Sequence, residues 1–148
     1  MSTPTSRQPG TEWLAWSTAW AGAVALAILN GALHRGYQGA LGELRAQQAS
    51  SVALLVLLAP WMRWVERRHP LPTTAAAVQV GLLWTGATVA FEFLFGHYVN
   101  RDSWSRLFSA YNLAKGQLWP LDLLGIAILP ALARTWRTGH RPTEPGRS

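Results

Sequence analysis

Apolar residues form four long blocks, and the segments between the blocks and at the two ends of the chain carry most of the charge. The blocks lie at about 13–33, 44–65, 73–99 and 116–135. A helix needs about 20 residues to cross the hydrocarbon core of a bilayer. The first block supplies such a run without a charged residue, whereas the fourth reaches this length only if it includes Asp122. The pattern predicts an all-α integral membrane protein, a four-helix bundle whose fourth span is the least apolar.

The two ends of the chain differ from this apolar region. Residues 1–11 and 137–148 are rich in Pro, Gly, Ser and Thr, so we expect them to be disordered cytoplasmic tails. The four-span transmembrane domain then covers 12–136. Three glycines in the first loop predict a sharp turn there, because glycine adopts backbone conformations closed to other residues: Gly36, Gly39 and Gly42.

The segment before the fourth block has a helical periodicity of its own. Four apolar residues fall on one helical face: Trp104, Leu107, Phe108 and Tyr111. Asp102 or Ser103 can cap a helix that begins at this point. Two interpretations stay open: a short helix lies in the membrane interface, or the fourth span begins early, at Ser105.

Composition agrees with a membrane protein. Hydrophobic residues make up 49% of the chain and charged residues 14%, whereas soluble domains are near ~25% charged. Most of the tryptophans lie near predicted span ends, where indole rings favour the bilayer interface. Trp84 is mid-span, so we expect it to pack against another helix. The chain has no cysteine and therefore no disulfide or thiolate metal site. The net charge of +6 is not pooled on one face, so the bilayer, not nucleic acid, is the expected partner.

The distribution of basic residues predicts the orientation. With four spans, both tails and the second loop share a side and carry eight of the 13 Lys and Arg residues. The densest cluster, Arg63, Arg67 and Arg68, belongs to this side. We therefore expect a multi-pass protein of a bacterial inner membrane with both termini in the cytoplasm. The bias is modest, so insertion in both orientations, as an antiparallel dimer, stays open.

Two ionisable side chains fall inside the predicted spans, Glu92 and Asp122. A charge at the centre of a span costs roughly 2.5–3.5 kcal/mol on insertion scales, so such residues are candidate functional groups. The third and fourth spans are consecutive and antiparallel, which predicts that the two carboxylates lie at similar depth. Glu92 shares a helical face with small and hydroxyl residues that allow close helix packing: Gly81, Thr85, Thr88 and Gly96.

A polar pocket at the outer end of the bundle is the resulting hypothesis. Its candidate ligand-binding residues are Glu92, His97, Arg45, Asp122, His34 and Asn30. The structural alternative is that Arg45 neutralises Glu92 or Asp122, and that Asp122 sits in a first helical turn, where the helix dipole favours an anion. The histidine spacing does not indicate a metal site, and we expect no catalytic residue and no cofactor.

Part of the sequence resembles a pattern in short, uncharacterised multi-span membrane proteins of bacteria. The stretch Phe91–Val99 carries most of the resemblance, followed by Ser103-Trp104, Tyr111–Leu113 and Gly116–Trp119. The run Gly42–Gln48 is similar to another part of that pattern. That group has no established activity, so the resemblance implies no function. It implies only that these polar positions belong to one recurring design.

These observations favour a small membrane protein that acts as a binding or accessory component, not an enzyme. Its expected partner is a second copy of the chain or another membrane protein. The alternative is a proton- or cation-coupled transporter that uses Glu92. A membrane enzyme that acts on lipid head groups through Glu92 and His97 ranks last, because the sequence has no nucleophile or metal motif.

Overall fold

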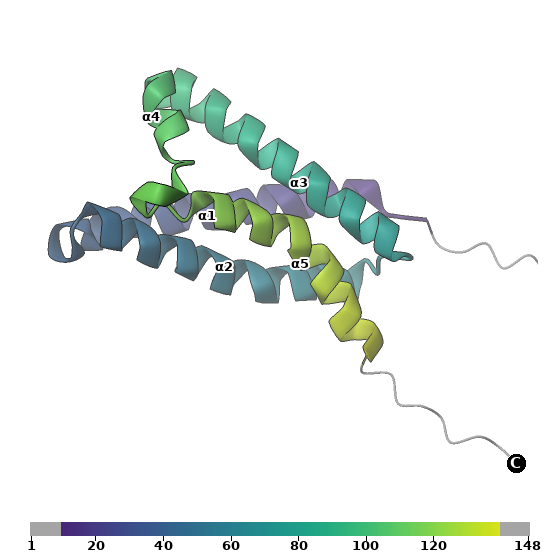
Figure 1. Cartoon of the computed structure of the whole chain (residues 1–148). Coiled ribbons are helices and arrows are strands. Elements are labelled where there is room, and N and C mark those ends of the chain that lie inside the picture. Colours follow the sequence, from purple (N-terminus) through teal and green to yellow (C-terminus); the bar gives the residue numbers. More distant parts are fainter. Residues whose placement is uncertain (1–9, 140–148) are drawn as a thin grey trace, which may run out of the picture.

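The computed structural model describes residues 10–139, and every regular element in this part is helical (Figure 1). The elements are α1 (Trp13–Leu41), α2 (Glu43–Arg68), α3 (Thr74–Leu94), a π-helical turn (Phe95–Val99), α4 (Trp104–Ser109), a 3-10 turn (Leu113–Lys115) and α5 (Trp119–Gly139). The predicted all-α fold is confirmed. Most of both predicted tails, 1–9 and 140–148, lies outside the described residues.

Two predicted boundaries were wrong. Gly36 and Gly39 do not end the first helix, which continues to Leu41. A glycine inside a helix costs only about 1 kcal/mol, and an otherwise unbroken helix tolerates that cost. The chain turns at Gly42, whose φ of +79° favours glycine. At the other end, residues 137–139 belong to α5 and not to a tail.

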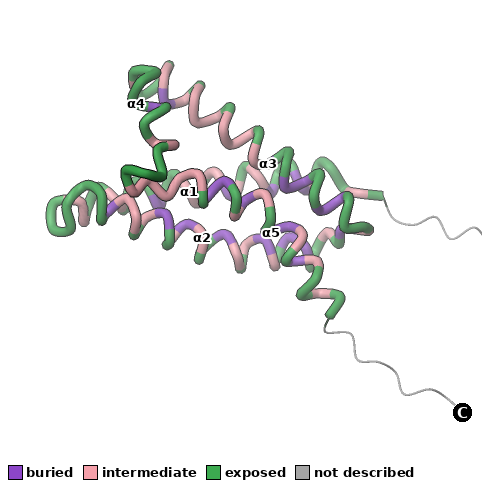
Figure 2. Tube along the Cα trace, viewed as in Figure 1, coloured by how far each residue is buried: buried purple, intermediate pink, exposed green. Residues whose placement is uncertain are grey.

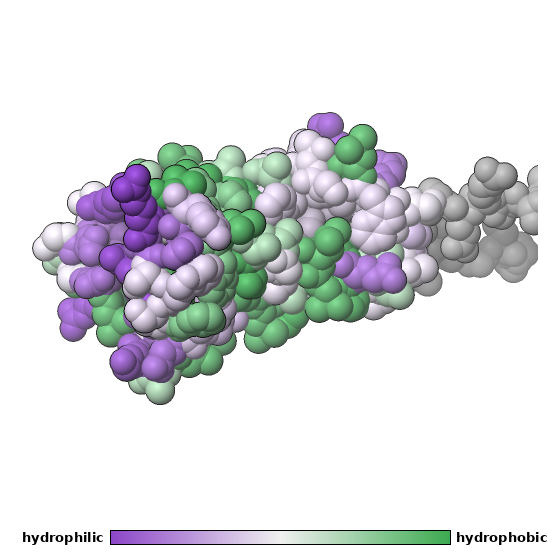
Figure 3. Space-filling view, turned by 90° about the horizontal axis from the view of Figure 1, so that it is seen from above, coloured by the Kyte–Doolittle hydropathy of each residue, from purple (hydrophilic) through white to green (hydrophobic). Residues whose placement is uncertain are grey.

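Three of the helices are long and apolar enough to cross a bilayer: Trp13–Leu41, Glu43–Arg68 and Thr74–Val99. The helix α5 is not among them. Large apolar side chains face outward, including Leu14 at 82% exposure and Leu82 at 63%. Figure 3 shows hydrophobic residues over much of the middle of the molecule and hydrophilic residues gathered towards one end. Length, composition and this surface support a multi-pass membrane protein.

The helices do not contact one another equally. The helix α5 packs on α2 and α3, and α1 packs mainly on α2. In Figure 1, α3 slants away from the other long helices towards α4. We call the end with Gly42 and α4 the α4 end, and the end with the α2–α3 loop and Gly139 the tail end. Figure 2 shows few buried positions on the part of α3 near α4.

Close packing of α3 explains several of its residues. The Trp84 ring lies edge-on to Trp16, with centroids 5.9 Å apart, and its indole Nε1 donates to the Trp16 carbonyl at 3.2 Å. The prediction that Trp84 packs against another helix is thus confirmed. A Cβ added to Gly81 would lie 2.0 Å from the carbonyl oxygen of Ala127. Only glycine therefore fits where α3 meets α5, as the predicted small-residue face requires.

The short helix before α5 is also confirmed. Ser103 Oγ accepts a hydrogen bond from the Arg106 backbone N–H at 3.3 Å and so caps α4. Leu107 is buried and packs against Gly96, where an added Cβ would lie 2.6 Å from Leu107 Cδ2. The alternative of a fourth span that begins at Ser105 was wrong. The chain instead passes through Gly116, with a φ of +82°, before α5 begins.

Candidate functional site

Glu92 lies on α3 near the α4 end and binds the segment that returns to α5. Its Oε2 accepts hydrogen bonds from Tyr111 Oη and from Trp119 Nε1, both at 2.7 Å. The residue is half-buried. No side chain or backbone group in residues 10–139 donates a hydrogen bond to the other oxygen, Oε1. Oε2 is thus held by two hydrogen bonds from the protein, and Oε1 can accept hydrogen bonds from a ligand.

Both donors to Glu92 are neutral. Tyr111 lies outside the spanning helices, where burial, and after it the hydrogen bond to Glu92, raises the pKa of Tyr111 to about 12. The phenol therefore stays protonated and keeps donating at every physiological pH. No ion pair reaches Glu92 from the part of the chain that the structure describes. The carboxyl group is therefore held by two neutral donors and by no ion pair within residues 10–139.

Asp122 occupies the first turn of α5 and is buried, with 1% exposure. Neither of its oxygens makes a well-formed hydrogen bond with the described residues, and the Ser51 hydroxyl on α2 is the polar group that faces it. The residue after Asp122, Leu123, has its carbonyl oxygen 3.4 Å from Thr85 Oγ1 on α3, and Thr85 comes seven residues before Glu92, about 10 Å along that helix. The two carboxyl groups have different partners.

Asn30 and His34 come from consecutive turns of α1. Asn30 is buried, and its Nδ2 donates to the Ser50 carbonyl at 2.9 Å and to Ser50 Oγ at 2.8 Å. This amide therefore ties α1 to α2. His34 is half-buried, and its ring contacts Tyr37 on its own helix, with centroids 5.7 Å apart. Of these two candidates, only Asn30 faces another helix.

His97 and Arg45 lie apart from both carboxylates. His97 Nδ1 is 3.0 Å from the carbonyl oxygen of Asp102, and its ring stacks on Trp104 with centroids 4.1 Å apart. His97 therefore shapes the connection to α4. Arg45 is exposed on the first turn of α2 and forms no ion pair with Glu92 or Asp122 within residues 10–139. The expectation that Arg45 neutralises a carboxylate was wrong, because its position on α2 points it outward.

A small apolar cavity lies beside the Glu92 group. Its volume is about 30 Å³, and residues of α1, α2, α3 and α5 line it. Trp20 Nε1 donates to Thr88 Oγ1 at 3.2 Å across one wall, and Trp119, which holds Glu92, forms part of another. The space suffices for about two water molecules. The six candidate residues are thus distributed around the α4 end and do not line one common pocket.

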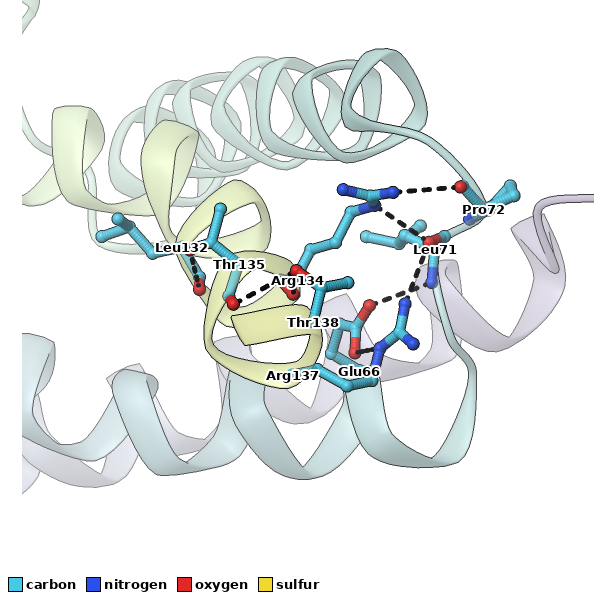
Figure 4. Close-up of polar contacts among 8 residues, drawn as sticks. All are labelled: Glu66, Leu71, Pro72, Leu132, Arg134, Thr135, Arg137 and Thr138. Carbon is cyan, nitrogen blue, oxygen red and sulfur yellow. Dashed lines mark hydrogen bonds and ion pairs between the residues drawn. The ribbon is translucent and has the colours of Figure 1, made fainter. Parts of the chain in front are cut away.

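Figure 4 shows a cluster of polar contacts at the tail end. This cluster was not predicted from the sequence. Glu66 is 1% exposed, and its Oε2 accepts from Arg137 Nε at 2.7 Å. Its Oε1 accepts from the Leu71 N–H at 3.1 Å. Arg134 donates from Nε to the Leu71 carbonyl and from Nη2 to the Pro72 carbonyl, both at 3.2 Å. The cluster joins the end of α5 to α2 and to the α2–α3 loop.

One sequence signal points to the buried position of Glu66. It continues a series of core residues at steps of four along α2: Leu54, Leu58 and Met62. Residues four apart lie on the same helical face, so the series predicts a buried carboxylate next to an arginine-rich segment. Arg137 gives no such signal, because the composition around it is typical of a tail.

Comparisons with protein families, with curated proteins and with solved structures find no match for this chain.

Proposed function

We propose that this chain is a four-span membrane protein that acts as a binding or accessory component, and that Glu92 is its binding group. The observation that carries the proposal is the half-buried carboxylate with one oxygen held by Tyr111 and Trp119 and the other without a donor. A carboxylate at this depth is costly unless it is protonated or meets a cation. Its ligand is therefore a proton, a small cation, or a cationic group of a partner in the membrane.

The proposed fourth span is α5. Its 21 residues extend about 31 Å, close to the ~30 Å of a bilayer core. Its polar residues have protein groups around them, since Asp122 faces Ser51 and Arg137 pairs with Glu66. Four spans would bring both ends of the described chain to one side, and the modest excess of basic residues there favours the cytoplasmic side. The membrane that we propose is a bacterial inner membrane. A reporter that is active only in the cytoplasm, fused after residue 148, is expected to be active.

Proton- or cation-coupled transport is the second candidate. It is favoured by Asp122, a second carboxyl group, which is buried three residues beyond Trp119, a donor to Glu92. The cavity between the four helices is small and apolar, so transport would need a pathway between copies of the chain. We rank it below binding for this reason.

Carbodiimide labelling tests the proposed role of Glu92. A membrane-soluble carbodiimide reacts with a protonated carboxyl group, and mass spectrometry of the labelled protein locates the product. We expect labelling of Glu92 that rises as the pH falls and that sodium or another small cation suppresses. Glu92→Gln should remove this label, whereas the matched variant Asp122→Asn should keep it. A Glu92 that reacts at no pH, or whose labelling neither pH nor cations change, would contradict the proposal.

Proton flux into vesicles that contain the purified protein separates the two candidates. A binding component gives no flux above that of empty vesicles. A flux that the native protein supports and Glu92→Gln abolishes would replace the leading proposal with the second.

A further inference from the structure

A second cavity lies at the tail end, far along the helices from Glu92. Its volume is about 130 Å³, and it is lined by residues of α2 and α5: Arg63, Arg67, Ala133, Trp136 and Arg137. Three of the five lining side chains are guanidinium groups, and a fourth is an indole. The proposed function makes no use of this cavity.

The cavity carries positive charge that the described residues do not neutralise. Arg63 and Arg67 are four residues apart on α2, where two like charges on one face disfavour the helix. Neither forms an ion pair within residues 10–139. Arg63 is half-buried and Arg67 is exposed. An anion between the two arginines would offset their mutual repulsion.

The third arginine is held in a fixed orientation. Arg137 donates from Nε to Glu66 and from Nη2 to the Leu71 carbonyl at 3.3 Å. Glu66 is buried, both of its oxygens accept hydrogen bonds, and Arg137 is the arginine with which it forms an ion pair within residues 10–139. The buried pair therefore sets one wall of the cavity before a ligand arrives.

We propose that this cavity binds a phosphate group, and that an anionic membrane phospholipid supplies it. Guanidinium groups bind phosphate oxygens through charge-assisted, often paired hydrogen bonds. The cavity lies where α2, a helix able to span the bilayer, reaches its charged end. Trp136 lines the same cavity and is consistent with a position at the bilayer interface, which indole rings favour. Basic pockets between spanning helices recognise anionic lipid head groups.

Native mass spectrometry of the full chain in detergent tests this site. The probes are phosphatidylglycerol, phosphatidylcholine and inorganic phosphate. We expect phosphatidylglycerol to be retained in preference to phosphatidylcholine. Arg63→Gln and Arg67→Gln should each weaken its binding about tenfold, as the loss of one charge-assisted hydrogen bond predicts. Circular dichroism should show unchanged helix content, since Arg67 is exposed and Arg63 only half-buried.

Arg68→Gln is the matched control. It removes the same charge from the same helix end, but Arg68 lies over the Trp64 ring, 5.1 Å from its centroid, and does not line the cavity. It should change lipid binding less than about twofold. Arg137 is not varied in this experiment, because its loss would also leave the buried Glu66 carboxylate without its ion-pair partner.

The three probes separate the sources of the phosphate. The lipid head group is supported if the protein retains phosphatidylglycerol but does not bind inorganic phosphate, and if Arg63→Gln and Arg67→Gln weaken that retention. Binding of inorganic phosphate with the same response to the variants supports a free phosphate at the same site. Absence of binding by all probes would overturn the proposal. So would an equal effect of Arg68→Gln, because the attraction would then be general to the basic helix end.

Discussion

Replacement of Glu66 by glutamine tests the role of the tail-end cluster. Glutamine keeps an oxygen that can accept from the Leu71 N–H, but it removes the negative charge that Arg137 contacts at 2.7 Å. Loss of one partner from a buried ion pair typically costs about 3–5 kcal/mol. The Arg137 side chain is 24% exposed, so water recovers part of its solvation. We therefore expect Glu66→Gln to lower the free energy of unfolding by about 2–3 kcal/mol.

Reversible unfolding in mixed detergent micelles, followed by circular dichroism, measures this loss. The matched control is Glu12→Gln. Glu12 pairs with His69 at the same end of the bundle, but its side chain is 60% exposed. Exposed ion pairs contribute about 0–1 kcal/mol, so the control should lose less than about 1 kcal/mol.

A double-mutant cycle with Arg137→Gln decides whether the pair is responsible. Groups in direct contact show coupling energies of about 0.5–3 kcal/mol, whereas independent sites add. We expect coupling above about 1 kcal/mol, because either single change leaves an unpaired group at the same contact. If the two losses simply add, the cost of Glu66→Gln comes from another contact and the reasoning fails.

Two further predictions concern α3 and its contacts. Gly81→Ala should destabilise the fold by about 2 kcal/mol, because its Cβ would lie 2.0 Å from the Ala127 carbonyl oxygen. Gly86→Ala, with nothing within 4 Å of the added carbon, should be neutral or gain up to about 1 kcal/mol, and the same unfolding assay compares the two. Because the folded state raises the pKa of Tyr111 from 10.0 to about 12, the stability that the neutral phenol contributes is present below pH 10 and lost between pH 10 and about 12. Phenolate absorbance should show a component with this high midpoint that Tyr111→Phe removes, and its persistence in the variant would refute the assignment.

The long helices and the small-residue face of α3 could be predicted because their causes are local. A bilayer requires a long apolar run, and such runs are visible without knowing where the helices pack. The steps of three and four from Gly81 to Gly96 placed the close contacts on one face, and Ala127 and Leu107 meet that face in the structure. The turn was harder to place, because Gly36 and Gly39 tolerate a helix as well as a bend.

The partners of the charged residues could not be predicted in the same way, as Arg45 and Arg137 show. An arginine side chain is long and flexible, so its position in the sequence restricts the location of its charge only weakly. Arg45 was expected in the polar pocket or paired with a carboxylate and is exposed, whereas Arg137 was expected in a tail and reaches a carboxylate 71 residues away. A glycine has no side chain beyond the backbone, so a face of glycines shows directly where another helix can approach closely. The contact of a guanidinium depends on how α5 and α2 approach each other, and that approach is set by packing along the whole length of both helices.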